Sequence, residues 1–151
     1  HYFAKLYLST NAADYESFLK INKPKYDDSW ERWNRTLDML KNLDTRTVLR
    51  ITLIRNYNDQ KEMIPAFAEM FRKASPHFIE IKSYMHIGRS TNRLEHENML
   101  EMSEVKKFSE QIAKESKIFS IMDESIVSRI SILQNNERFI DRWIPTYSNT
   151  N

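Results

Sequence analysis

The chain has 151 residues, a length typical of one domain, and its 23 basic and 21 acidic side chains leave a formal charge of only +2. This balance gives no electrostatic indication of a nucleic-acid-binding protein. The single glycine excludes a Walker phosphate loop and a glycine-rich dinucleotide turn, and the lack of cysteine excludes disulfides, cysteine zinc sites and protein-held iron–sulfur clusters. No apolar run approaches the roughly 20 residues that cross a bilayer, so we expect no membrane partner.

Three apolar runs, at residues 6–10, 47–54 and 78–84, are rich in aromatic or β-branched residues and predict strands. Between them, apolar side chains recur every three or four residues over 28–43 and 63–74, which predicts two helices. The pair Asp28 and Glu31 favours a capping box at the first helix, and Pro65 favours a second helix that begins close to it. This alternation predicts an α/β fold with a parallel sheet, whose strands end at one edge.

The pattern changes after residue 84. A polar loop is followed by a predicted helix over 103–116 and by two short strand-like runs, at 118–122 and 127–133. We expect these two runs to pair with each other at one edge of the sheet.

Two features suggest binding chemistry, and each has a simpler explanation. The stretch 82–94 contains three cations and two aromatic rings but no acidic residue, which suits phosphate binding and base stacking. On charge pattern alone, a solvated basic loop is the more common structure. Arg50 lies within an apolar strand and must find a partner or a pocket, unless one face of that strand meets water. The histidines lack the spacing of a metal site, and we predict none.

Longer stretches resemble one family. The runs 7–14, 22–58 and 77–88 are similar to the C-terminal half of the tRNA 4-demethylwyosine synthases, the wybutosine-synthesising radical S-adenosylmethionine enzymes. The most specific pieces are Trp30-Glu31-Arg32, TRTVLRITL at 45–53 and FIEIK at 78–82. Shorter matches extend the similarity nearly to residue 133.

The resemblance implies an architecture in three regions. Residues 1–84 would form the second half of an incomplete radical-SAM (βα) TIM-like barrel, residues 85–144 a wyosine base formation-type region with a small α+β extension, and residues 145–151 a tail. A missing N-terminal half of the barrel would be the partner of this chain. His1 in place of Met agrees with a chain that begins within a longer protein.

The resemblance also implies an activity. Members of this family are cytoplasmic lyases that condense N1-methylguanosine, next to the anticodon of phenylalanine tRNA, with carbons from pyruvate. Their cofactors are S-adenosylmethionine and 4Fe-4S clusters, whose cysteine ligands lie in the N-terminal half. Because this chain has no cysteine, we expect it to hold no catalytic residue and to be inactive alone.

Ten residues match positions to which the family assigns contacts. Those expected at S-adenosylmethionine are Ser9 and Asn11 near its ribose or methionine part, Arg50 and Thr52 near its carboxylate and the substrate, and Tyr84, Met85 and His86 beside its adenine. Those expected at tRNA phosphate or substrate are Lys82, Arg89 and Arg93. Two other hypotheses stay open: a non-catalytic RNA- or tRNA-binding module that uses the 82–93 loop, and a remnant that has lost its activity.

Overall fold

The computed structural model of the protein describes residues 5–138, which contain one five-stranded sheet in the order β1-β2-β3-β5-β4. The strands β1 (Lys5–Ser9), β2 (Arg46–Leu53) and β3 (Phe78–Ser83) are parallel. The strands β4 (Phe119–Ser125) and β5 (Ile130–Asn135) form an antiparallel hairpin, and β5 pairs with β3. The predicted parallel strands are therefore confirmed to within one residue at each end, and the hairpin does lie at a sheet edge.

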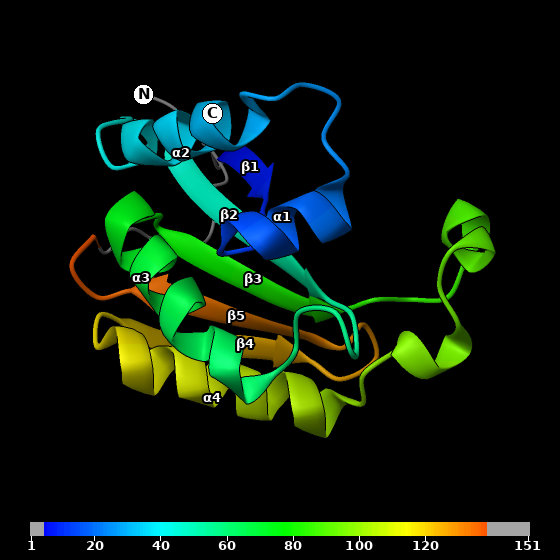
Figure 1. The fold of residues 1–151 in the computed structure, drawn as a ribbon. Coiled ribbons are helices and arrows are strands. Elements are labelled where there is room, and N and C mark those ends of the chain that lie inside the picture. The colour runs from blue at the N-terminus through cyan, green and yellow to red at the C-terminus, as the bar shows by residue number, and fades with distance from the viewer. Residues whose placement is uncertain (1–4, 139–151) are drawn as a thin grey trace, which may run out of the picture.

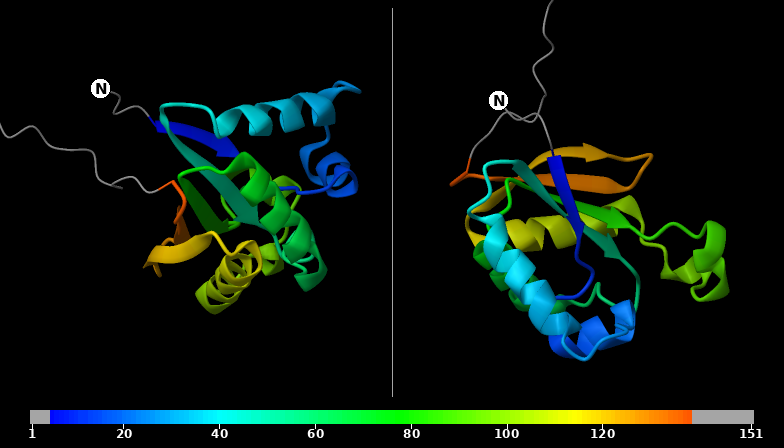
Figure 2. Two further views of the ribbon diagram at one scale, coloured as in Figure 1. Left: turned by 90° about the vertical axis from the view of Figure 1, so that its left-hand side faces the viewer. Right: turned by 90° about the horizontal axis from the view of Figure 1, so that it is seen from above.

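Four α-helices occur in the described part of the chain, and all of them lie on one side of the sheet (Figures 1 and 2). They are α1 (Tyr15–Asn22), α2 (Ser29–Leu40), α3 (Ile64–Ala74) and α4 (Met102–Ser116). Three short 3-10 turns complete the list: η1 (Lys61–Met63), η2 (Gly88–Asn92) and η3 (His96–Asn98). The predictions for α2, α3 and α4 are confirmed. None of these helices is long and apolar enough to span a membrane.

The helix α1 and the start of α2 differ from the sequence prediction. The helix α1 was not predicted, although the Asp14 carboxylate caps it by accepting hydrogen bonds from the backbone N–H and hydroxyl of Ser17 (2.8 and 3.0 Å). The predicted capping box at α2 is wrong. The Asp28 backbone is not extended, and its carboxylate pairs with the Arg32 side chain at 2.7 Å instead of accepting a hydrogen bond from a backbone N–H of the first turn.

The core lies between the helices and one face of the sheet. Leu49, Ile51 and Leu53 of β2 are fully buried, as are Phe71 of α3 and Ile112 of α4. Because side chains alternate along a strand, the residues between these core positions project from the opposite face. We call this the open face, since no described helix covers it (Figure 2).

The sheet ends at β1 on one side. The hydrogen-bonded ladder of β1 runs to β2 alone, and no other described strand pairs with it. One row of backbone donors and acceptors along β1 is therefore open for pairing with a further strand.

Candidate functional site

The open face becomes polar toward the carboxyl ends of the parallel strands. Strand register places Tyr7, Val48 and Phe78 in one row across the sheet. The next row toward the carboxyl ends contains Ser9, Arg50 and Glu80, and the row after it contains Thr52 and Lys82. Four of the predicted site residues thus share one surface, at the end of the sheet where α/β proteins bind ligands.

Arg50 is the most constrained residue on this surface. Its Nε donates to Glu80 Oε1 at 3.1 Å and its Nη2 to Glu80 Oε2 at 3.4 Å, while its guanidinium carbon lies 4.8 Å from the centre of the Tyr7 ring. The side chain remains 35% exposed. The expected partner is therefore present, and the remaining nitrogen is free of described partners and can bind a carboxylate or phosphate oxygen.

The side-chain amides of Asn11 and Asn58 form a hydrogen-bond network that connects the carboxyl ends of β1 and β2. The Asn11 side-chain oxygen accepts the Thr52 N–H at 2.9 Å. The buried Asn58 side chain donates to the carbonyls of Asn11 (3.0 Å) and Thr52 (2.9 Å) and accepts the Ile54 N–H (2.7 Å). One end of the Asn11 amide is thus used for architecture, which leaves its Nδ2 as the donor for a ligand.

A segment at residues 85–98 follows β3 and extends away from the body of the protein (Figures 1 and 2). We call it the projecting segment. The Tyr84 hydroxyl, just before it, lies 2.8 Å from His86 Nδ1 and 3.2 Å from Ser90 Oγ. Tyr84 is 5% exposed, so its ring is held by these contacts, whereas Met85 is exposed. Arg89 and Arg93 are exposed in and after η2.

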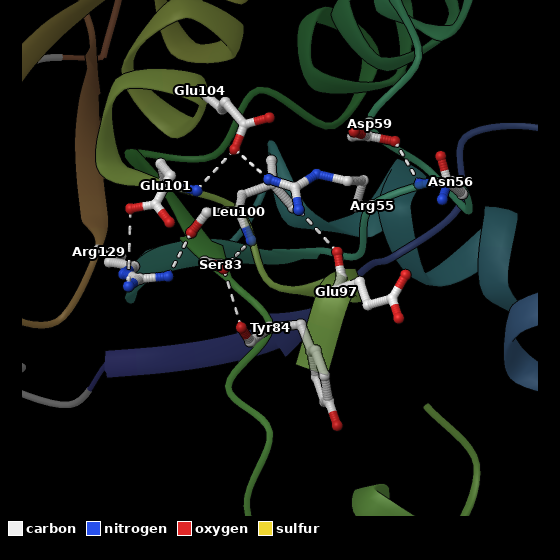
Figure 3. Close-up of polar contacts among 10 residues, drawn as sticks. All are labelled: Arg55, Asn56, Asp59, Ser83, Tyr84, Glu97, Leu100, Glu101, Glu104 and Arg129. Atoms are coloured by element: carbon white, nitrogen blue, oxygen red, sulfur yellow. Dashed lines mark hydrogen bonds and ion pairs between the residues drawn. The ribbon is translucent and has the colours of Figure 1, made fainter. Parts of the chain in front are cut away.

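Polar contacts anchor the projecting segment at both ends. At its start, the Tyr84 N–H donates to the Leu53 carbonyl at 2.7 Å. The contacts at its other end are drawn in Figure 3. The Ser83 hydroxyl accepts the Leu100 N–H at 2.8 Å, and the Arg129 guanidinium donates to the Leu100 carbonyl at 2.7 Å. The Arg55 guanidinium donates to the Glu97 carbonyl at 2.7 Å and pairs with the Glu104 carboxylate. These contacts connect residues that are 17 to 49 positions apart in the sequence.

The Glu104 carboxylate belongs to two of these contacts at once. It also accepts the Glu101 N–H at 2.7 Å, which completes a capping box at the start of α4. Partial burial opposes ionisation, but the Glu101 N–H and the Arg55 guanidinium outweigh it and lower the pKa of Glu104 below its ordinary value.

A cleft of about 190 Å³ lies between the carboxyl ends of the strands and the projecting segment. Its lining includes Asn11, Lys20, Lys23, Tyr57 and Arg93. The structure therefore brings Asn11 and Arg93 to one cleft. It does not group Lys82 with Arg89 and Arg93, because Lys82 belongs to β3 and projects from the open face.

Sequence reasoning missed several residues of this region. The cleft lysines were missed because Lys20 lies on the unpredicted helix α1 and Lys23 is its C-cap residue. Asn58 was not predicted to be part of the site, and Glu80 entered only as part of the FIEIK motif. Within residues 5–138, no group of three or more histidine, aspartate or glutamate side chains is arranged to hold a metal ion.

Comparisons with known proteins agree on one family. The family model for wyosine base formation matches residues 73–135. The S-adenosyl-L-methionine-dependent tRNA 4-demethylwyosine synthase of Methanocaldococcus jannaschii is 42% identical over 91% of this chain, and that of Pyrococcus abyssi is 35% identical over 88%. The corresponding protein of Oryza sativa is 36% identical over 89% of the chain.

Solved structures give the same result. A structure of TYW1 with a lysine-pyruvate adduct bound has a TM-score of 0.80 at 40% identity, and a crystal structure of archaeal TYW1 has a TM-score of 0.72 at 35% identity. Each covers 90% of this chain. The chain spans about two fifths of the archaeal relatives and of these solved chains, and about one fifth of the plant relative.

Proposed function

Since the chain corresponds to the C-terminal part of the tRNA 4-demethylwyosine synthase family, we propose that it forms the part of such an enzyme that contacts S-adenosylmethionine and tRNA. Its three parallel strands would be the last strands of an incomplete barrel, and the open face would line the interior. The free edge of β1 is where the preceding strands of an N-terminal half would pair.

The observation that supports this proposal most directly is the row of Ser9, Arg50 and Glu80, followed by Thr52 and Lys82, at the carboxyl end of the open face. An amino-acid cofactor presents a carboxylate and an ammonium group. The free Arg50 nitrogen suits the carboxylate, and the Glu80 carboxylate suits the ammonium. The donor set of this chain thus fits S-adenosylmethionine.

The chain does not fit the iron–sulfur cluster, because it has no cysteine to ligate iron. When bound, S-adenosylmethionine and a reduced cluster held by the N-terminal half would supply a 5′-deoxyadenosyl radical. The role of this chain is to orient the cofactor by Arg50 and to exclude water from it by the Tyr7 and Phe78 row. Pyruvate and phenylalanine tRNA carrying N1-methylguanosine are the proposed substrates.

Reconstitution tests this proposal. The chain is mixed with the part of the Methanocaldococcus jannaschii relative that it does not match, and 4-demethylwyosine is measured by mass spectrometry of the tRNA. We expect product from the mixture and none from either part alone. Arg50→Met should lower product at least tenfold, whereas Arg35→Met, which removes an exposed arginine of α2, should not.

Three outcomes discriminate between the hypotheses. A mixture that binds S-adenosylmethionine equally well with and without Arg50 would remove that residue from the cofactor site. Salt-sensitive tRNA binding by the chain, with no cofactor binding and no product in the mixture, would instead favour the RNA-binding module. No binding of either ligand would favour the inactive remnant.

A further inference from the structure

The cleft beside the projecting segment contains three cations whose charges have no described partner. Lys20 lies on α1, Lys23 is the C-cap residue of α1, and Arg93 comes from a loop 70 positions after Lys23. No acidic side chain lines the cleft. None of the three cations forms an ion pair within residues 5–138.

Some cations of residues 5–138 pair with carboxylates and others, such as Lys41 and Lys107, do not; this cleft is distinctive because unpaired cations from two separate segments line it together. The arginines at 32, 50, 55, 72 and 129 each pair with a carboxylate, as do Lys73 and Lys106. In the cleft, the Lys20 ammonium instead lies 5.0 Å from the centre of the Tyr57 ring. An aromatic ring holds a cation without neutralising it, so the charge stays available to an anion.

A structural role for the lysines explains only part of the cluster. Lys20 lies in the last turn of α1 and Lys23 is its C-cap residue, where positive charge interacts favourably with the helix carbonyls. That effect does not require Arg93, which lines the same cleft from the segment that follows β3. The turn of η2 places Arg93 there, because its N–H donates to the Ser90 carbonyl at 3.0 Å.

From this convergence we propose that Lys20, Lys23 and Arg93 form a binding site for backbone phosphates of the tRNA substrate. The inference rests on the proposed function and adds a location for the RNA backbone. Phosphodiester oxygens accept hydrogen bonds from ammonium and guanidinium groups and carry the opposite charge. The cleft lining includes Asn11 and Ile54, which follow the carboxyl ends of β1 and β2, so an RNA strand held there can deliver an adjacent nucleoside to this end of the sheet.

Salt dependence of tRNA binding tests the site. Binding of a fluorescent phenylalanine tRNA anticodon stem-loop to the full chain is measured from about 50 to 300 mM KCl. Replacing all three cations by glutamine should reduce the slope of log K against log salt by about 2, and Arg93→Gln alone by about 1. Affinity at the lowest salt should fall about tenfold or more for the triple variant.

A charge-matched control makes the comparison specific. Glutamine at Lys41, Lys107 and Lys114 removes the same charge from exposed positions after α2 and on α4. We expect this control to change the slope by less than 0.5, since these lysines lie outside the cleft. Circular dichroism melting of each variant identifies any that fails to fold, and Arg93→Gln, at an exposed loop position, leaves the helix α1 untouched.

Failure of the inference and failure of the proposed function are distinguishable. If the wild-type chain binds the stem-loop and the cleft variants match the control, the phosphate site is refuted and the proposed function stands. If the control loses as much slope as the triple variant, binding follows net charge and the site is again refuted. If the wild-type chain and its mixture with the N-terminal half both fail to bind, the proposed function fails, and this inference fails with it.

Discussion

The two faces of the sheet are built from the same strands but differ in burial and polarity. On β2, Leu49, Ile51 and Leu53 are fully buried under the helices, while Arg50 and Thr52 alternate with them on the open face. Burial of the first set stabilises the fold at roughly 25 cal/mol per Å² of apolar surface. A partly exposed ion pair such as Arg50–Glu80 contributes about 0–1 kcal/mol. Stability therefore explains the apolar composition of the covered face, whereas it accounts for little of the polar pattern on the open face.

The largest effect on stability is expected in the core, where α3 packs on the covered face of the sheet. Phe71 is fully buried, with its ring centre 6.1 Å from that of Phe67 and 6.4 Å from that of Phe119. Phe71→Ala should lower the free energy of unfolding by about 3–5 kcal/mol in urea titrations. Tyr15→Ala, at a half-exposed ring, should lower it by less than about 1 kcal/mol. Equal losses in the two variants would contradict the assignment of the core.

A pH-dependent effect is expected where β2 and β3 begin. His77 is buried, its Nδ1 accepts the Thr47 N–H at 3.0 Å, and burial, followed by the charges of Arg138 and Arg46, lowers the pKa of His77 to about 4. The unfolded chain takes up this proton near pH 6.5 and the folded chain only near pH 4. The contribution of neutral His77 to the free energy of unfolding is therefore fully present above about pH 6.5, and it falls by up to about 3 kcal/mol as the pH drops toward 4.

The matched variant for this prediction is His77→Asn, whose side-chain oxygen can accept the Thr47 N–H without titrating. Its stability should vary less between pH 6.5 and 4 than that of the wild type in chemical denaturation series. Parallel pH profiles for the two proteins would show that His77 is not the responsible group.

A moderate effect on stability is expected at the amide network that follows the carboxyl ends of β1 and β2. Asn58→Ala removes three hydrogen bonds and leaves the Ile54 N–H without its partner in a buried position. We expect a loss of about 1–3 kcal/mol in the free energy of unfolding. Asn42→Ala, at an exposed position after α2, should cost less than about 0.5 kcal/mol. A neutral Asn58→Ala would mean that water replaces the amide without cost.

The smallest effect on stability is expected on the open face. The double variant Arg50→Met/Glu80→Gln removes both charges, so that neither is left unpaired, and should change the free energy of unfolding by about 1 kcal/mol or less. Product formation with an N-terminal half should nevertheless fall at least tenfold. A loss of stability comparable to that of Phe71→Ala would show that the open face also carries the fold.

Most of the architecture follows from local patterns. Strong apolar runs located β1, β2 and β3, and helical spacing located α2, α3 and α4, because each presents an apolar face to the core, which is fully buried in β2, β3 and α3 and only partly buried in β1. The helix α1 was not predicted because it has no helical pattern of buried apolar residues: Phe18 is its one buried apolar side chain. The predicted end of α2 near residue 43 was late, because Leu43 packs against the core from beyond the helix end at Leu40.

The candidate site was less accessible to sequence reasoning. The prediction that Arg50 needs a partner followed from one strand, but the identity of Glu80 depends on the register between β2 and β3, which are 30 positions apart at that pair. The cleft lysines meet Arg93 through the crossover of α1 and the path of the projecting segment. These contacts between distant parts of the chain are determined by tertiary packing, so no local sequence pattern predicts them.

The anchoring of the projecting segment has a consequence for how this protein can be altered. Ser83, Arg55 and Arg129 hold its two ends to strands and loops of the main body, so residues 86–94 are structurally separable from the sheet. A loop that is tied to the scaffold mainly at its ends tolerates changes in length and sequence better than the strands and helices of the core do. Exchange of these residues between relatives should therefore leave the fold intact.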